Sequence, residues 1–494
     1  MIAESRKLTR LKGMVDVLPE EAERRAHLAA QLAGCYARAG YLPLETPLLE
    51  RSELLLRRAG DQLAERLYSF EHRGRQLALR PEFTTGVARA YIEGGMSGTP
   101  TRLRYSGPVF LENPGRGRPR QFTQAGFELI GAAGPRADAE ALTLAAATME
   151  GLRGWNIEVG HLGLVSILLD QLGLDHQASS LLVANLENLN RPGRSRLYVE
   201  ERLAPFYGPL SDPPALEAAA GRERISGEAA LALSASSNDG AQGEVYERLR
   251  IKMGRRQQSG LVGRGLALLD ELSKAAGEPF AALAAARAIL RAHGLDGRGS
   301  VILDELERTF NIAAGGVPLE RVRLNLAFGR GLLYYTGILF EVRSPSLPDD
   351  APLGGGGRYD DLIAALGGPP TPACGFACTL ERLSAALVSE RELPPLRYHL
   401  MVVPLGSDDV EAALQLAARL RKMGKRVEME VVERKLDASL RYADRAKIST
   451  VFMIGPDERA GGYVTLRDMS EHTERRIALT RLETVDWVGD TNDE

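Results

Sequence analysis

Three separated stretches of the chain combine residue types that can bind a small charged ligand. In the first, Leu79-Arg-Pro-Glu-Phe-Thr-Thr85, a carboxylate and two hydroxyl groups stand where a strand is expected to give way to a helix. At such a position Glu82 can hold an ammonium group, and Thr84 can add a hydrogen bond. The alternative for this stretch alone is a helix cap with a surface glutamate.

The second stretch, Arg120 to Glu128, reads RQFTQAGFE. If it is a strand, alternate residues share a face, so Gln124 and Glu128 project together. Gly126 lies between them and leaves space, which suits a small polar ligand held by an amide and a carboxylate. A sheet edge without a ligand explains the same pattern.

The third stretch runs from Gly329 to Gly337, and four further glycines follow at Gly354 to Gly357. Arg330, between two glycines, can approach a carboxylate or a phosphate closely. The adjacent Tyr334 and Tyr335 offer aromatic walls that carry hydroxyl groups. The four-glycine run lacks the lysine of a phosphate-binding loop, and alone it favours a tight turn between strands.

Composition limits the class of protein. The 494 residues, 44% hydrophobic and 26% charged, are typical of a folded protein of about three domains. The 62 basic and 65 acidic residues exclude a globally basic nucleic-acid binder, but leave room for a local basic patch. Three cysteines predict neither a disulfide framework nor a metal site. Without a long apolar run or an apolar leader, we expect a cytoplasmic protein that does not enter a membrane.

Hydrophobic spacing predicts the elements that position these stretches. Helices are expected at 19–40 and 84–94, and strands at 101–110 and 120–131. The pattern divides the chain into four segments: a first core segment, 1–165; a mostly helical insertion, 166–320; a second core segment, 321–392; and an α/β domain with a mostly parallel sheet, 398–494.

Together, the motifs resemble the class II aminoacyl-tRNA synthetases in their histidyl version. Gly40 to Glu50 resembles motif 1, residues 102–131 resemble motif 2, and Gly375 to Arg382 resembles motif 3. LRPEFT, GRGLLYYTG and GGGGRYDDL resemble the family's histidine-specific segments. The resemblance implies an α+β fold: an antiparallel-sheet core with a helical insertion, an anticodon-binding-like α/β domain, and a homodimer.

The same resemblance implies a histidine pocket. Glu82 and Gln124 would hold the α-ammonium group of histidine, with help from Thr84. Arg330 would meet the carboxylate, and Glu128 and Tyr335 would address the imidazole. Tyr359 would close the pocket, and Phe83 and Tyr334 complete the implied histidine-binding set.

The chain departs from the synthetase pattern on the nucleotide side. Leu111 stands where motif 2 has an arginine for the α-phosphate, Leu333 replaces an aspartate, and Phe83 replaces a glycine. An arginine lost from such a site typically costs about 3–4 kcal/mol of transition-state stabilisation. A residual nucleotide site would use Arg116, Arg118 and Arg382.

A sister family of the synthetases does not activate amino acids with ATP: the regulatory subunit of ATP phosphoribosyltransferase. The stretches TQAGFELIG and IEVGHLGL resemble segments of that family. We therefore predict a histidine-binding regulatory subunit without catalytic residues, cofactor or metal. L-histidine would be its ligand, and a catalytic ATP phosphoribosyltransferase subunit its partner under feedback control. The C-terminal domain favours the alternative, a histidine–tRNA ligase that uses ATP and Mg²⁺ and binds tRNA. A third hypothesis is a tRNA-binding module without ligase activity.

Overall fold

The protein is described by a computed structural model that forms two compact units, Met1–Glu392 and Leu393–Glu494. Each unit is described by itself. The residues described are 9–57, 64–96, 100–112, 114, 119–190, 195–208, 210, 258–329, 334–347, 352–390 and 400–483.

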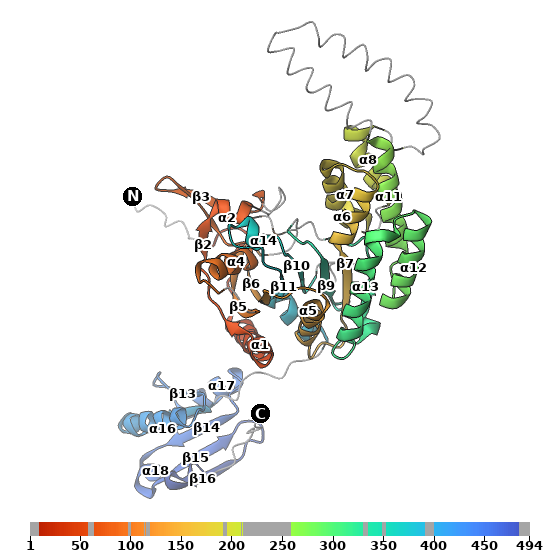
Figure 1. Cartoon of the computed structure of the whole chain (residues 1–494). Coiled ribbons are helices and arrows are strands. Elements are labelled where there is room, and N and C mark those ends of the chain that lie inside the picture. Colours follow the sequence, from red (N-terminus) through yellow and green to blue (C-terminus); the bar gives the residue numbers. More distant parts are fainter. Residues whose placement is uncertain are drawn as a thin grey trace, which may run out of the picture. The chain divides into compact units, whose positions relative to one another are not determined.

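The first unit is built on an eight-stranded sheet with the order β1-β5-β6-β11-β10-β9-β7-β8 (Figure 1). The pairs β1–β5 and β7–β8 are parallel and the other neighbours are antiparallel. Its strands are β1 (Leu42–Pro43), β5 (Thr101–Phe110), β6 (Gln121–Ile130), β7 (Asn156–His161), β8 (Val322–Leu324), β9 (Ile338–Arg343), β10 (Gly354–Arg358) and β11 (Ala373–Thr379). The predicted antiparallel core is confirmed, with parallel strands only at its margins.

The four-glycine run is a buried strand, so the expected tight turn is wrong. Gly354 to Gly357 form β10 between β9 and β11. A Cβ atom on Gly356 would lie 2.1 Å from the carbonyl oxygen of Gly375, and one on Gly357 would lie 2.5 Å from that of Ile338. The neighbouring backbones therefore occupy the space of these side chains, and only glycine fits.

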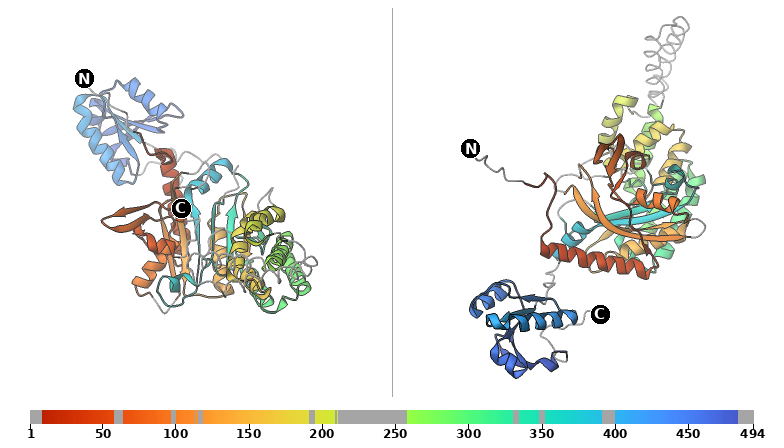
Figure 2. Two further views of the ribbon diagram at one scale, coloured as in Figure 1. Left: turned by 90° about the horizontal axis from the view of Figure 1, so that it is seen from above. Right: turned by 90° about the vertical axis from the view of Figure 1, so that its left-hand side faces the viewer.

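Helices cover the sheet where their apolar stripes predict. Helix α1 (Pro19–Arg38) starts with Pro19 and an acidic first turn, and buries Leu28, Leu32 and Tyr36, as its spacing predicts. It contacts β5, β6 and α15 (Leu380–Glu390), and Figure 2 shows it running along the sheet. Helix α5 (Pro135–Ala147) packs against β10 and β11.

A smaller sheet carries the strand-to-helix transition of the first candidate stretch. It consists of β2 (Leu49–Arg51), β4 (Arg75–Leu79) and β3 (Ser69–His72), in that order. Helix α2 (Ser52–Leu56) packs on it. Strand β4 leads through LRPEF into α4 (Thr84–Glu93), which contacts α14 (Leu362–Ala365). The predicted helix at 84–94 is confirmed.

Helices fill the part of the chain between β7 and β8. They are α6 (Leu162–Gln171), α7 (His176–Leu189), α8 (Arg196–Tyr207), α11 (Ser259–Lys274), α12 (Pro279–Ala292) and α13 (Asp296–Ala313), with a short 3-10 turn η2 (Leu319–Arg321) before β8. Figure 1 shows them grouped beside β7. They belong to the same hydrophobic core as the sheet. Residues 211–257 of the predicted insertion lie outside the described ones.

The second unit is a five-stranded sheet with the order β13-β12-β14-β15-β16. Strands β12 (Leu400–Pro404), β13 (Val427–Met429) and β14 (Thr450–Ile454) are parallel, while β15 (Tyr463–Asp468) and β16 (Glu474–Ala478) continue the sheet antiparallel. Its helices are η3 (Ser407–Asp409), α16 (Val410–Lys422), α17 (Leu436–Arg445), α18 (Pro456–Gly461) and η4 (Leu479–Arg481). The predicted α/β alternation is confirmed. The sheet has two parallel and two antiparallel strand pairs, so the expectation of a mostly parallel sheet is wrong. Within the described part of both units, no helix combines the length and hydropathy needed to cross a membrane.

Replacing Gly356 by alanine tests the close approach in β10. We expect Gly356→Ala to lower the free energy of unfolding by roughly 1–3 kcal/mol, because the obstructing atoms belong to the backbone of β11. Gly277→Ala is the matched control, since no described atom lies within 4 Å of its added Cβ. Denaturant titration of both variants measures the difference. Equal stabilities would show that β10 and β11 separate at no cost.

Candidate functional site

The first two candidate stretches meet in the first unit. Glu82 and Phe83 precede α4, Thr84 begins it, and Gln124 and Glu128 lie on β6. The backbone N–H of Phe83 donates to Gln124 Oε1 at 3.0 Å, which ties the start of α4 to β6. The sequence prediction that these residues come together is consistent with this arrangement.

The carboxylate of Glu128 is the centre of the site, with 1% of the residue exposed. Its Oε1 accepts hydrogen bonds from the Thr84 hydroxyl at 2.8 Å and the Tyr105 hydroxyl at 3.0 Å. Its Oε2 accepts one from the Tyr359 hydroxyl. A carboxylate has about four acceptor positions, so these three described donors leave room for one more.

Space for this carboxylate comes from glycines on two strands. Gly375 on β11 pairs with Glu128, and a Cβ there would lie 1.7 Å from Glu128 Oε2. Gly126 on β6 pairs with Tyr105 on β5, and a Cβ there would lie 2.7 Å from the Tyr105 hydroxyl. The gap predicted between Gln124 and Glu128 therefore receives the tyrosine hydroxyl.

Burial raises the pKa of Glu128 to about 7, because desolvation penalises the charged form. The hydroxyls of Tyr359, Thr84 and Tyr105 act in the opposite direction, since they donate to the carboxylate. The nearby charge of Glu82 adds to the upward shift. Around neutral pH, Glu128 can therefore exist as an acceptor or as a neutral acid.

Glu82 supplies a second acceptor. Its Oε1 accepts from the backbone N–H of Thr85 at 3.0 Å, whereas its Oε2 is buried without a hydrogen-bond partner among the described residues. A buried carboxylate oxygen is costly unless it is paired. This oxygen is therefore open to a donor, and the role predicted for Glu82 in holding an ammonium group stays a prediction.

The tyrosines of the third stretch line the same region. Tyr334 and Tyr335 have ring centroids 4.7 Å apart, and Tyr334 meets Tyr359 edge-on at 6.1 Å. Tyr335 also lines a cavity of about 530 Å³ together with residues of α2, α6 and α7, among them Leu56, Leu162 and His176. Arg330, Leu333, Arg116 and Arg118 lie outside the described residues, so their predicted roles stay predictions.

Arg358 holds the chain beside Tyr359. Its guanidinium bridges Asp138 at 2.7 Å and Asp360 at 2.9 Å, with 6% of the residue exposed. These carboxylates raise the pKa of Arg358 against the effect of desolvation. Sequence reasoning missed this ion-pair network. It also missed Tyr105, which the β5–β6 register would have revealed as the neighbour of Gly126.

The nucleotide-side residues of motif 2 lie at one end of the β5–β6 pair. Phe110 pairs with Gln121, and the Leu111 N–H donates to the Arg120 carbonyl oxygen, so Leu111 and Arg120 stand opposite each other. Arg120 donates to the Tyr68 hydroxyl at 3.2 Å. Arg382 of motif 3 donates through Nε to the Pro352 carbonyl oxygen at 2.9 Å.

His161 has a structural role, as the residue's apolar surroundings favour. Its Nδ1 accepts from the Leu164 N–H at 2.9 Å and caps α6. Desolvation lowers the pKa of His161 to about 4, so the ring is neutral at pH 7. The three cysteines are free. Among the residues that the structure covers, no cluster of His, Cys, Asp and Glu has the makings of a metal site.

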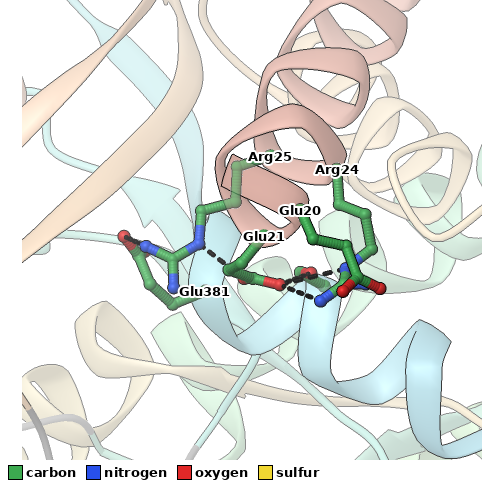
Figure 3. A network of polar contacts seen from close by, with 6 residues as sticks. Glu20, Glu21, Arg24, Arg25 and Glu381 are labelled. Atoms are coloured by element: carbon green, nitrogen blue, oxygen red, sulfur yellow. Dashed lines mark hydrogen bonds and ion pairs between the residues drawn. The ribbon is translucent and has the colours of Figure 1, made fainter. Parts of the chain in front are cut away.

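A polar network connects α1 to Glu381 of α15 (Figure 3), and Glu381 also contacts the start of β6. Glu381 accepts from the Thr123 backbone N–H with both oxygens, at 2.9 and 3.0 Å. It also pairs with Arg25 of α1 at 2.8 Å, and Arg25 pairs with Glu21 at 2.6 Å. Thr123 precedes Gln124, so this network fixes the strand next to the histidine-site candidates.

The antiparallel sheet flanked by helices, with this site on it, is the catalytic-domain architecture of a class II aminoacyl-tRNA synthetase. The family described as histidyl-tRNA synthetase matches residues 13–253 and 229–383, and the anticodon binding domain matches residues 399–490. The chain belongs to the histidyl-tRNA synthetase family.

Individual relatives agree with this assignment. A histidine–tRNA ligase of Synechococcus sp. is 31% identical over 93% of this chain and 94% of its own. The structure of histidyl-tRNA synthetase from Nostoc sp. matches with a TM-score of 0.71 at 20% identity, covering 96% of this chain and 97% of that one. An ATP phosphoribosyltransferase regulatory subunit/histidyl-tRNA synthetase from Bacillus halodurans matches with a TM-score of 0.67 at 23% identity, covering 90% and 98%. These structural likenesses show the fold alone.

The prediction of a non-catalytic regulatory subunit is wrong. Curated relatives that match nearly the whole chain at about 30% identity are named histidine–tRNA ligase. The same relatives do not support the preference for a non-enzyme. They also do not support a catalytic ATP phosphoribosyltransferase subunit as the partner. The prediction gave the departures at Leu111, Leu333 and Phe83, and two short stretches that resemble the sister family, more weight than the C-terminal domain.

Removing Glu381 tests the network of Figure 3. Glu381→Ala leaves the Thr123 N–H without its acceptor and leaves Arg25 with Glu21 as its remaining partner, so we expect it to cost about 1–3 kcal/mol of folding free energy. Glu20→Ala is the control, because its pair with Arg24 is exposed and worth less than about 1 kcal/mol. Urea unfolding measures both. Equal losses of folding free energy in the two variants would show that Glu381 stabilises the fold no more than an exposed ion pair does.

Proposed function

We propose that the protein is a histidine–tRNA ligase. Histidine would attack the α-phosphate of ATP, giving histidyl adenylate and pyrophosphate. A ribose hydroxyl at the end of the tRNA would then take the histidyl group and release AMP. The observation that carries the proposal is the buried Glu128 carboxylate among three hydroxyl donors, together with Glu82, whose Oε2 atom is buried and has no hydrogen-bond partner among the described residues.

The two carboxylates suit the two ends of histidine. The Glu82 Oε2 atom would accept from the α-ammonium group, beside the Gln124 amide. Glu128 would accept from an imidazole N–H at its remaining acceptor position. An apolar ring of similar size lacks this donor, and a site whose buried acceptor stays unpaired rejects such a ligand strongly.

Arg120 supports nucleotide binding in spite of Leu111. Directly opposed residues of an antiparallel pair project to the same face, so Arg120 and Leu111 share a face. Because alternate residues of a strand share a face of the sheet, Arg120 lies on the same face as Gln124 and Glu128. The Arg120 guanidinium would bind the α-phosphate of ATP, as the motif 2 arginine does in the family pattern. ATP would enter with Mg²⁺ as a substrate, and Arg382, Arg116 and Arg118 are further candidates for its phosphates.

We also propose that the partner is tRNA and that the protein works as a homodimer in the cytoplasm. The match of residues 399–490 to an anticodon binding domain supports tRNA binding by the second unit. The motif 1 resemblance of Gly40 to Glu50 supports dimerisation. The three free cysteines agree with a reducing compartment.

Histidine-dependent ATP–pyrophosphate exchange and charging of a histidine tRNA test the function. We expect both activities in the native chain. Glu128→Gln should reduce exchange by roughly 10–150-fold, the equivalent of about 1.5–3 kcal/mol for a hydrogen bond to a charged group. Glu140→Gln, at an ion pair with Arg102, is the control that keeps its activity. Histidine binding without exchange or charging would overturn the proposal.

A second experiment addresses Leu111. If Arg120 supplies the cation, Arg120→Met should lower the exchange rate by about 10²–10³. Leu111→Arg should change it by less than about 10-fold, because the charge is already present. Arg104→Met is the control, since Arg104 pairs with Phe127 and belongs to the opposite face. A large gain in Leu111→Arg would identify the nucleotide site as incomplete.

Histidine affinity should depend on the protonation of Glu128. Because the pKa of Glu128 is about 7, its carboxylate form is lost as the pH falls below that value, and we expect the dissociation constant to rise. Free histidine titrates near pH 6.5 as well, so Glu128→Gln serves as the reference that keeps only the ligand's own titration. Calorimetry between pH 5.5 and 8.5 measures both. Identical profiles would exclude Glu128 as the imidazole acceptor.

A further inference from the structure

Phe83, which replaces a glycine of the family pattern, is the middle layer of a three-part stack. The Arg80 guanidinium lies 3.8 Å from the centroid of the Phe83 ring. On the other face, the Tyr105 ring is nearly parallel, at 4.4 Å between centroids and an angle of 9°. All three residues are buried, with at most 6% exposed. The ring of Phe83 thus contacts a cation on one side and a tyrosine on the other.

The cation end of this stack is fixed to the backbone. Arg80 donates from Nε to the Pro108 carbonyl oxygen at 2.9 Å and from Nη1 to the Thr46 carbonyl oxygen at 2.7 Å. The backbone at Gly107 lies against the edge of the Arg80 and Phe83 side chains. A Cβ atom there would lie 2.7 Å from Arg80 Nη2 and 3.1 Å from Phe83 Cζ. The stack therefore has little freedom to slide.

The tyrosine end of the stack reaches the candidate histidine site. The Tyr105 hydroxyl donates to Glu128 Oε1 at 3.0 Å. The second torsion of a tyrosine has a broad energy well, so rotamer preference alone does not fix the ring plane. A parallel ring held at 4.4 Å restricts that plane and the path of the hydroxyl.

We propose that Phe83 is a positioning residue for histidine recognition, whose ring is clamped on Arg80 and holds the Tyr105 hydroxyl on Glu128. The inference rests on the proposed function, because it names the device that orients the imidazole acceptor. Phe83 acts through Tyr105 and needs no contact with histidine. A glycine at this position, as in the family pattern, would have no ring to do this.

The charge state of Glu128 reports on this device. The titratable groups that face it are Glu82 from the start of α4, Tyr105 from β5, Tyr359 after β10 and Cys374 from β11. Of these, the tyrosine hydroxyls stabilise the carboxylate, and Glu82 destabilises it. Loosening the Tyr105 hydroxyl removes one stabilising donor, so the pKa of Glu128 rises further.

A double-mutant cycle between Phe83→Leu and Tyr105→Phe tests the inference. The readouts are the infrared carboxyl titration of Glu128 in the free protein, referenced to Glu128→Gln, and the pH midpoint of histidine affinity by calorimetry. Tyr105→Phe should raise the carboxyl midpoint by about 1.1–2.2 pH units, the equivalent of one hydrogen bond to a charged group, and Phe83→Leu should raise it by part of that amount. Phe83→Leu should add nothing in the Tyr105→Phe background, because its target hydroxyl is gone.

Gly107→Ala provides a second variant in case Phe83→Leu fails to fold. Its added Cβ presses on Arg80 and Phe83 from the side, so it should also raise the midpoint in the native background and not in Tyr105→Phe. Equal shifts in both backgrounds, or no shift in either, would overturn the inference. Absence of histidine binding to the native chain would overturn the proposed function instead, and the infrared titration would still decide the role of Phe83.

Discussion

The buried carboxylate of Glu128 is the constraint on which the first unit depends. A carboxylate removed from water is tolerated only when hydrogen bonds replace its hydration. Three separate parts of the chain supply these bonds: the start of α4, strand β5 and the residue after β10. Gly375 on β11 provides the space. The arrangement of the sheet and the chemistry of the site are therefore set by the same group.

Two departures from the family pattern have structural answers within this arrangement. Leu111 removes a guanidinium group, yet the strand register gives Arg120 the opposing position on the same face. Phe83 adds a ring, and the ring lies between Arg80 and Tyr105 instead of blocking the site. At both positions, a residue from elsewhere in the chain lies beside the substituted one: Arg120 beside Leu111, and Tyr105 beside Phe83.

This explains why the sequence favoured a regulatory subunit. A missing motif arginine can be judged only against the cations around it, and Arg120 becomes a neighbour of Leu111 through strand pairing. The complete second unit, with its anticodon binding match, pointed to a ligase from the outset. Under the proposed function, Arg120 supplies the cation that the motif position at Leu111 lacks.

The sequence by itself determined the elements and the candidates. The apolar stripe of α1, the alternation that brings Gln124 and Glu128 to one face, and the α/β pattern of the second unit follow from local periodicity. Only the tertiary structure decided that the glycine run is a buried strand, that Tyr105 donates to Glu128 and that Phe83 is clamped by Arg80. These facts depend on which backbones approach across the sheet, a long-range property that local spacing does not encode.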